Sequence, residues 1–352
     1  MSDMLAIVHE RYGSPDRVLR LQTVSRPVAG NGQVLVRVRA ASVHPDIWHV
    51  VTGRPYVLRL MGNGARRPKK TIPGSDLAGT VKSIGTNVSR FRVGDEVFGE
   101  TDMSWVNGGA FAEYAVARED WLALKPGNVS FAQAASVGTS GLIALTDIAR
   151  TQPGSHLRPE RIKPGHHLLI NGAGGNVGSL AIQIAKSRGA HVTGVDHSCK
   201  LELIRSLGAD RVIDYTKEDV LQSTERYDLI FDVASTLNLK RAQHLLKATG
   251  TYWVVGHDNF SNASGRILGS IPYMLGLMLR ASFGHPHLAR PDFKTMPSRR
   301  SVMETLKELM ASGTLTPVIG KTFALDEIPS AIRCMEQGGV AGRIVIVPDI
   351  AR

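Results

Sequence analysis

Hydrophobic and polar residues follow two different periods along this chain. Toward the N-terminus short apolar runs alternate with polar residues, as at 34–38 and 79–85, and turn residues separate them closely, as at 93–97. Further along, apolar runs typical of buried strands alternate with segments whose apolar residues recur at helical spacing. This pattern predicts a β-rich part followed by a doubly wound α/β part with a parallel sheet.

The α/β part is expected from about residue 137 to residue 256. Its expected strands cover 168–171, 191–195, 211–213, 228–233 and 251–255. Its expected helices cover 177–184, 200–207 and 239–247. The tail returns to mixed structure, with helices expected at 302–311 and 328–335 and a last strand at 342–347.

The most informative segment runs from Leu168 to Gly178, where an apolar strand meets Asn-Gly-Ala-Gly-Gly-Asn-Val-Gly before a helix. Its glycines stand where the chain must turn sharply and where backbone amides approach a pyrophosphate without an intervening Cβ atom. The helix N-terminus would face the phosphates with its partial positive charge. The next strand ends at Asp196, roughly the ~20 residues downstream where an acid binds the ribose hydroxyls. We expect a dinucleotide site, the alternative being a similar turn in an unrelated doubly wound domain.

Composition narrows the class of protein. The 352 residues suffice for two domains, and 43% hydrophobic content without an apolar run of about 18 residues predicts a soluble globular protein. The first residues, Met-Ser-Asp-Met, lead us to expect no secretory signal. Cys199 and Cys334 are the two cysteines, which fits a reducing cytosol and excludes a four-cysteine zinc site. We therefore predict a cytoplasmic protein.

Several motifs occur in a fixed order. They lie at 41–46 (Ala-Ser-Val-His-Pro-Asp), 72–79 (Ile-Pro-Gly-Ser-Asp-Leu-Ala-Gly), 93–97, 108–114, the glycine turn, and 341–345. Over nearly the whole chain this series resembles the medium-chain dehydrogenase/reductases, and more closely their zinc-free quinone oxidoreductase-like branch.

The resemblance implies a doubly wound parallel Rossmann domain for NAD(P) plus a β-rich, GroES-like catalytic domain. The catalytic domain would be discontinuous, formed by residues 1–137 and 298–352. The Rossmann domain would occupy 138–297, with a basic and apolar segment at 266–300. Substrate would bind in the cleft between the domains.

The resemblance also bears on zinc. Zinc-dependent relatives carry a cysteine in the segment matching 43–46 and a histidine followed by glutamate in the segment matching 74–76, and neither occurs here. The structural zinc lobe is missing too, since residues 90–115 contain no cysteine. His44, His49 and Asp76 still offer nitrogen and oxygen donors. We predict a protein without zinc.

Hydride transfer without a metal relies on orientation and on a hydrogen-bond donor near the developing oxyanion. That favours activated acceptors, so we predict reduction of a quinone, an α,β-unsaturated ketone or a reactive aldehyde by NAD(P)H. The alternatives are alcohol oxidation of the alcohol dehydrogenase type, or a nonenzymatic membrane- or RNA-binding protein that retains the cofactor fold. With 6% aromatic residues and no recognised motif, we expect no nucleic acid partner.

The candidate catalytic residues are His44, Asp46 and Trp48. His44 replaces the asparagine usual in the zinc-free branch and could donate a proton near neutral pH. It could equally be a packed histidine that bonds the backbone. Asp46 would have a structural or cofactor-orienting role, and Trp48 would line the substrate cleft or belong to the core.

The candidate cofactor contacts surround the glycine turn and the strand ends. They are Ser140, Gly172, Gly175, Asn176, Val177, Gly178, Asp196, Lys200, Tyr215, Val255, Gly256 and Arg343. By resemblance Ser140 lies close to the nicotinamide, whereas Ile143 replaces a threonine common in the branch.

The sequence gives conflicting indications of whether the coenzyme is NADH or NADPH. Asp196 would accept hydrogen bonds from the ribose and repel a 2′-phosphate, which favours NADH. The branch more often uses NADPH, and His197, Ser198, Lys200 and Tyr215 could bind a phosphate. We expect NAD(P)H as cofactor, with NADH slightly favoured.

The net charge of +11 comes from two segments. Residues 54–70 contain six basic side chains and no acid, and residues 266–300 contain six basic side chains and one acid. The second segment also carries an apolar run at 267–279. These segments could form a basic, apolar mouth that attracts lipophilic or anionic substrates, or that docks the protein on an anionic membrane. The alternative is packing of 267–279 at a dimer interface, and the family resemblance does imply a homodimer.

Overall fold

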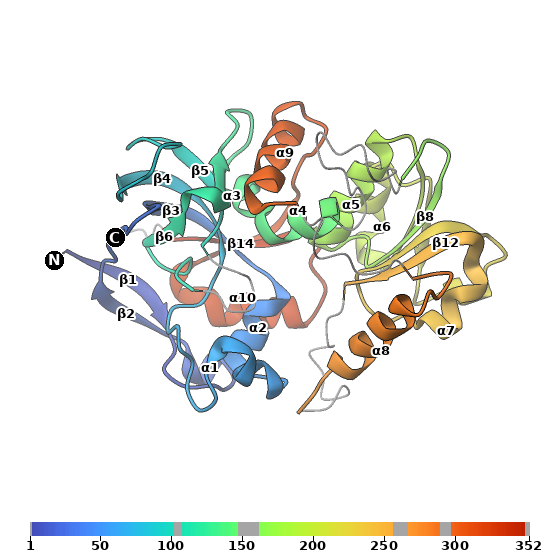
Figure 1. Ribbon diagram of the computed structural model, residues 1–352, viewed down its shortest axis with the longest axis horizontal. Coiled ribbons are helices and arrows are strands. Elements are labelled where there is room, and N and C mark those ends of the chain that lie inside the picture. Colours follow the sequence, from blue (N-terminus) through green and yellow to red (C-terminus); the bar gives the residue numbers. More distant parts are fainter. Residues whose placement is uncertain (1, 102–107, 147–161, 256–266, 289–296, 349–352) are drawn as a thin grey trace.

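The computed structural model describes residues 2–101, 108–146, 162–255, 267–288 and 297–348. Two layered parts lie side by side (Figure 1). One contains a mixed sheet formed by the blue, cyan and red segments, and the other a parallel sheet formed by green and yellow segments. Each part has its own cluster of buried apolar side chains, and a further cluster extends from the parallel sheet toward the mixed one.

The mixed sheet joins segments from both ends of the sequence. Among the described residues its strand order is β13-β14-β3-β4-β5-β7, with β6 also paired to β3. The strands are β3 (Gln33–Val43), β4 (Asp76–Ile84), β5 (Glu96–Glu100), β6 (Tyr114–Arg118), β7 (Leu122–Leu124), β13 (Ile319–Ala324) and β14 (Arg343–Val347). In β3, Val34, Val36 and Val38 are buried at every second position, as a strand requires. A separate antiparallel pair is formed by β1 (Asp3–Val8) and β2 (Arg20–Ser25).

The parallel sheet has the order β10-β9-β8-β11-β12 in the part of the chain that the structure describes. Its strands are β8 (His167–Asn171), β9 (His191–Asp196), β10 (Arg211–Asp214), β11 (Tyr227–Asp232) and β12 (Leu246–Val254). This order reverses direction at β8, so the crevice beyond the carboxyl end of β8 is where such sheets bind ligands.

Helices cover the sheets and connect the two parts. The longer ones are α2 (Pro45–Thr52), α4 (Gly138–Ala144), α5 (Asn176–Ser187), α6 (Leu201–Ser206), α8 (Ile271–Ser282), α9 (Arg299–Ala311) and α10 (Ile328–Glu336). The shorter α-helices are α1 (Pro15–Val18), α3 (Phe131–Ala135) and α7 (Leu239–Ala242). Single helical turns are η1 (Arg59–Asn63), η2 (Glu119–Trp121), η4 (Ser198–Lys200), η5 (Val220–Gln222), η6 (Gln243–Leu245) and η9 (Leu325–Glu327).

The predicted fold class is confirmed, while one element differs from its prediction. The expected helix 239–247 ends at Ala242, a 3-10 turn follows, and β12 already begins at Leu246. Leu239, Leu245 and Leu246 are all buried, so their spacing did not distinguish a helix from a turn that leads into a strand. The domain boundaries at 137/138 and 297/298 stay predictions.

The glycine turn after β8 meets the start of β14. The backbone N–H of Gly342 donates to the carbonyl of Gly174 at 2.9 Å, and Gly175 and Gly342 form a parallel bridge. A residue late in the sequence is thereby fixed beside the turn. None of the described helices is long and apolar enough to cross a membrane.

Candidate active site

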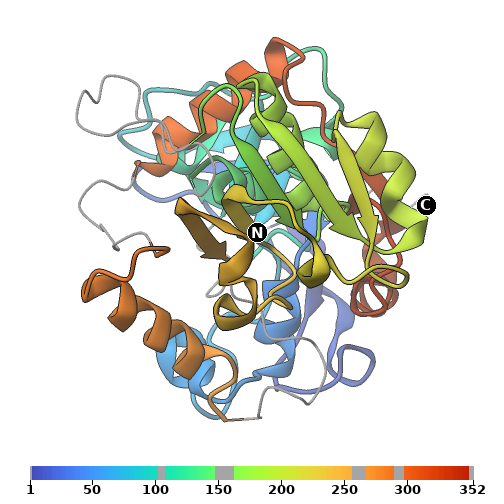
Figure 2. The ribbon, with the colours of Figure 1, turned by 90° about the vertical axis from the view of Figure 1, so that its right-hand side faces the viewer.

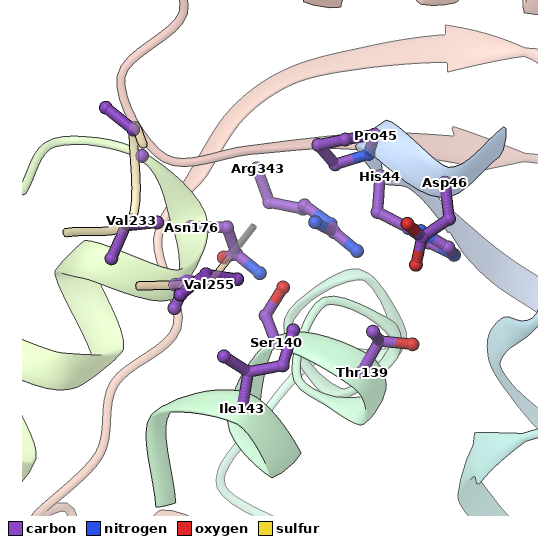
Figure 3. A pocket seen from close by; sticks show the side chains of 13 residues that line it. His44, Pro45, Asp46, Thr139, Ser140, Ile143, Asn176, Val233, Val255 and Arg343 are labelled. Atoms are coloured by element: carbon purple, nitrogen blue, oxygen red, sulfur yellow. The ribbon is translucent and has the colours of Figure 1, made fainter. Parts of the chain in front are cut away.

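A cavity of about 230 Å³ opens where the two parts of the molecule meet. It lies between the N-terminus of α2, helix α4, the glycine turn and the start of β14 (Figure 3). Its lining residues are His44, Pro45, Asp46, Thr139, Ser140, Ile143, Gly175, Asn176, Val177, Val233, Ala234, Val255 and Arg343. The structure therefore brings together eight of the fifteen predicted site residues.

The glycine turn is tightly packed at two of its glycines. Gly172 has a φ of 85°, in the left-handed region that favours glycine. A Cβ atom on Gly178 would lie 2.3 Å from the carbonyl oxygen of Gly172, so the first turn of α5 can pack this closely only as glycine. These two glycines shape the turn, while Gly175, Asn176 and Val177 line the cavity.

Asn176 offers an acceptor at the edge of the cavity. Its side-chain amide donates to the carbonyl of Ser136 at 2.7 Å, which fixes the orientation of the side chain. Its Oδ1 is buried and receives no hydrogen bond from the described residues. A buried acceptor without a donor is costly, so this atom is suited to a ligand that donates a hydrogen bond.

Asp196 stands at the carboxyl end of β9, as predicted, and is held by its neighbours. Its Oδ2 accepts from the N–H of Gly174 at 2.9 Å, and its Oδ1 accepts from the N–H of His197 at 2.8 Å. Lys200 Nζ lies 3.3 Å from Oδ1. Tyr215 is 58% exposed, with its ring 5.9 Å from that of His197. Asp196, Lys200 and Tyr215 lie outside the cavity lining.

A buried ion pair stabilises the side of the cavity formed by the mixed sheet. Arg343 at the start of β14 donates to Asp76 Oδ2 at 3.0 Å and to Ser42 Oγ at 3.0 Å. Thr139 Oγ1 donates to the other carboxylate oxygen of Asp76 at 2.6 Å. Burial lowers the pKa of Arg343 from its ordinary value, and Asp76 opposes that shift. The predicted role of Arg343 at the cofactor is compatible with this position, which Figure 3 shows beside Asn176 and Ser140.

His44 lies at the N-terminus of α2 and faces both the cavity and the buried network. Its Nε2 is 2.9 Å from Ser75 Oγ, and Ser75 Oγ donates to Asp76 Oδ1 at 3.2 Å. Its Nδ1 lies 3.6 Å from Asp46 Oδ2. Two carboxylates therefore flank the imidazole, Asp46 at 3.6 Å and Asp76 through Ser75.

Glu100 is a second buried carboxyl group that the sequence interpretation missed. It stands opposite Asp76 in the β4–β5 register and pairs with Arg299 at 2.6 Å. Burial and the Asp76 carboxylate raise the pKa of Glu100 to about 8, despite the opposing effect of Arg299. Glu100 follows the motif at 93–97, but its pairing with Asp76 becomes visible only from the strand register.

Trp48 and His49, which the sequence analysis considered for the site, do not line this cavity. Trp48 lines a different cavity, of about 380 Å³, together with Tyr12, Arg54 and Arg59. His49 Nδ1 is 2.6 Å from the carbonyl oxygen of Arg54. Helix α2 thus presents His44 and Asp46 to one cavity and Trp48 to another.

Of the remaining residues named in the sequence analysis, three line the first cavity and one cannot be placed. Ser140, Ile143 and Val255 line the first cavity, whereas Gly256 lies outside the described residues. Thr139, Val233 and Ala234 also line it and were not predicted. Thr139 adjoins Ser140, and Val233 and Ala234 follow β11, so the rule that ligands bind beyond strand ends could have found the latter two.

The donor set for zinc considered above does not come together. Among the described residues, no three or more His, Cys, Asp or Glu side chains are arranged to hold a metal ion. Asp76 is directed to Arg343 and Thr139, and His49 to a backbone carbonyl. These residues do not fit a zinc ion, while the absence of zinc from the protein stays a prediction.

Comparisons with known proteins agree with this arrangement. Residues 30–127 match the model of the alcohol dehydrogenase GroES-like domain, and residues 207–346 match the model described as zinc-binding dehydrogenase. The chain is 30% identical to 2-methylene-furan-3-one reductase of Solanum lycopersicum over 357 residues, covering 99% of this chain and 80% of the relative. It belongs to the medium-chain dehydrogenase/reductase superfamily, in the quinone oxidoreductase-like branch.

Two further relatives support the placement in this branch. The chain is 31% identical to the chloroplastic NADPH-dependent alkenal/one oxidoreductase of Arabidopsis thaliana over 361 residues, covering 98% of this chain and 80% of the relative. The structure of the quinone oxidoreductase from Coxiella burnetii superimposes with a TM-score of 0.78 at 26% identity, covering 98% of this chain and 99% of that one. The chain is an NAD(P)-dependent oxidoreductase, and the expected GroES-like domain is confirmed.

Proposed function

We propose that this oxidoreductase transfers hydride, without zinc, from NAD(P)H to a quinone, an α,β-unsaturated ketone or a reactive aldehyde. One observation carries the proposal. The glycine turn and His44, which lie more than a hundred residues apart in the sequence, line the same cavity. A cofactor-binding element and a candidate proton donor therefore face each other across a space suited to a small acceptor.

The residues around the cavity fit a nicotinamide cofactor. Gly175, Asn176 and Val177 at the start of α5 would hold its phosphates and the adjoining ribose, and the buried Oδ1 of Asn176 would accept one hydrogen bond. Ser140 and Arg343 lie at the part of the cavity near His44 and would position its reactive end. The cofactor, when bound, supplies the hydride.

His44 would supply the proton that completes the reduction. Asp46 at 3.6 Å and the Ser75–Asp76 pair hold its imidazole in place. Val233 and Val255 make part of the lining apolar and would limit the access of water to the acceptor. With the donor set for zinc absent from the described residues, positioning and hydrogen bonding would polarise the carbonyl, which is sufficient for activated acceptors.

A His44→Asn substitution tests this role. We expect kcat with an enone or quinone acceptor to fall by about a hundredfold, the worth of one general acid, while KM for the acceptor changes little. The matched control is His191→Asn, because His191 begins β9 with its side chain 56% exposed and lies outside the cavity lining. Equal kcat values for His44→Asn and the wild-type enzyme would contradict the proposed role.

A panel of acceptors tests the reaction class itself. Oxidation of NADH or NADPH is followed with quinones, α,β-unsaturated ketones and reactive aldehydes as acceptors. In the reverse direction, reduction of NAD+ or NADP+ is followed with simple alcohols. We expect turnover with at least one activated acceptor and little alcohol oxidation. Faster oxidation of simple alcohols than reduction of every activated acceptor would overturn the proposal.

For the coenzyme we propose a modest preference for NADH. The ribose hydroxyls would lie beside the carboxylate of Asp196, whose negative charge opposes a 2′-phosphate. Lys200, 3.3 Å away, partly neutralises that charge, which keeps the discrimination small.

Substitution of Asp196 measures this preference. We expect Asp196→Ala to lower the ratio of kcat/KM for NADH over NADPH by about tenfold, as expected for the loss of a charge-assisted hydrogen bond of about 1.5 kcal/mol. Lys200→Ala should change the ratio in the opposite direction. A strong NADPH preference in the wild-type enzyme that Asp196→Ala leaves unchanged would contradict the proposal.

A further inference from the structure

Large exposed apolar side chains are concentrated in two segments of the described chain. The others are scattered over separate elements. The clustered ones are Tyr56, Leu60, Met61, Ile267, Leu268, Tyr273, Leu275, Met278, Leu279 and Phe283. We call this the α8–η1 surface. Contiguous apolar surface on a folded protein marks an interaction site, whereas scattered apolar residues need no explanation.

Helix α8 is only partly covered by the rest of the chain. Among its twelve residues, Leu277 and Ala281 are buried, while Leu275 is 54% exposed and Leu279 is 60% exposed. Figure 2 shows α8 in orange along the edge of the molecule, with its first turn beside the blue segment that follows α2. An apolar helix that buries so few of its side chains requires a partner on its other face.

The two segments form one surface because their backbones are joined. The N–H of Val57, just before η1, donates to the carbonyl of Ile267, just before α8, at 3.0 Å. The loop after η1 folds back onto it, since the N–H of Lys69 donates to the carbonyl of Asn63 at 2.7 Å. Arg66, Arg67 and Lys69 are exposed in that loop.

The charge on this surface has one sign. Between Asp46 and Asp76 the sequence contains six basic residues and no acidic one. Residues 267–288 contain Arg280 and no acidic residue. Apolar side chains bordered by basic ones are complementary to an anionic and apolar partner.

A lipid surface meets both requirements, and a second copy of this chain does not. Pairing two copies through the α8–η1 surface would bring basic loops together without an acidic partner, which is unfavourable. The helix is too short to span a bilayer, but a helix of this composition can lie with its apolar face among the acyl chains and its basic neighbours at the headgroups. We propose that the α8–η1 surface docks the enzyme on membranes that contain anionic lipid.

Vesicle co-sedimentation of the full chain tests this proposal. Phosphatidylcholine vesicles with and without phosphatidylserine are used at low and near-physiological salt. We expect the wild-type protein to pellet with the anionic vesicles only, and less at the higher salt, because salt screens the basic loop. Each basic residue removed should weaken binding about fivefold.

Two triple variants and two matched controls locate the surface. Leu275→Glu/Leu279→Glu/Phe283→Glu and Arg66→Glu/Arg67→Glu/Lys69→Glu change exposed residues only, so folding should be retained, and thermal unfolding checks this. Val28→Glu/Val93→Glu/Ile84→Glu and Lys82→Glu/Arg92→Glu/Lys321→Glu make the same changes at exposed positions elsewhere. We expect both α8–η1 variants to lose vesicle binding and both controls to retain at least tenfold more of it.

The proposal is independent of which acceptor the enzyme reduces, because turnover of a water-soluble acceptor is measured separately on the same variants. No pelleting at either salt, equal pelleting with neutral vesicles, or equal loss in the controls would overturn it. So would a loss of self-association in the α8–η1 variants without any vesicle binding by the wild-type protein, because the surface would then be an interface between copies.

Discussion

Glu100 illustrates how a single buried residue can make the stability of the fold depend on pH. Its carboxyl group faces Asp76 across the sheet and Arg299 from α9, and Arg343 and Thr139 contact Asp76 from the other side. Its pKa is raised from the ordinary value of 4.5 to about 8. The folded protein therefore holds a proton that the unfolded chain releases. Stability gained from this proton is fully present below the unfolded-state pKa and is lost as the pH rises through about 8.

Thermal unfolding as a function of pH tests this coupling. Between pH 4.5 and about 8 we expect the midpoint of the wild-type protein to fall more steeply than that of Glu100→Gln, which has no titrating group there. The control is Glu202→Gln, an exposed position in α6. If the wild-type and Glu100→Gln curves run parallel, Glu100 is ionised in the folded protein throughout this range.

Single residues were predictable from the sequence where a motif carries them. His44, Asp46, Asn176 and Arg343 each belong to a recognisable motif, and the structure places all of them at the cavity. The neighbours that hold them were not predictable. Glu100 and Thr139 come from separate segments, and their proximity to Asp76 follows from strand register and helix packing. Ser75 adjoins Asp76 in sequence, but its contact with His44 depends on the fold. Trp48 was expected to line the cleft or to belong to the core, and in the structure it packs against a buried apolar cluster and lines the second cavity.

At the scale of elements, the turn between β8 and α5 is packed too closely to accept a side chain at position 178. A Cβ atom at position 178 would meet the Gly172 carbonyl at 2.3 Å and the Ala173 Cα at 2.6 Å. Both neighbours are backbone atoms, so the turn itself would have to move.

Gly178→Ala should therefore disturb both stability and cofactor binding. We expect a loss of about 1–3 kcal/mol in the free energy of unfolding, typical of overpacking, together with weaker NAD(P)H binding by fluorescence titration. Gly127→Ala is the matched control, because a Cβ atom there meets nothing within 4 Å. Unchanged stability and affinity in Gly178→Ala would show that the turn has room that the structure does not indicate.

The alternation of strands and helices predicted most elements because burial imposes a clear period on them. The strands of the parallel sheet and helices α5, α9 and α10 lie where apolar spacing placed them. The length of helix α7 was overestimated because the spacing of three buried leucines fits a helix as well as a turn. The pairing of β14 with β3 could not come from periodicity, since it joins residues about 300 positions apart, and only the family resemblance anticipated it.

At the scale of the whole molecule, the cavity exists because the chain returns to its first sheet. The backbone N–H of Gly342 donates to the glycine turn, and the side chain of the neighbouring Arg343 donates to Asp76. The two parts of the molecule are thereby held on either side of the cavity. Homodimer formation and a cytoplasmic location stay predictions of the sequence, and the first can be measured by analytical ultracentrifugation without vesicles.

Zinc-independent hydride transfer is tested most directly by following the hydride itself. The protein is first shown to be free of zinc by elemental analysis. It is then supplied with an α,β-unsaturated ketone and with NADH or NADPH deuterated at either face of C4, and the product is analysed by mass spectrometry. We expect one deuterium per product molecule from one of the two faces, at a rate that added zinc does not raise. A product without deuterium, or activity that appears only with zinc, would contradict the proposed function.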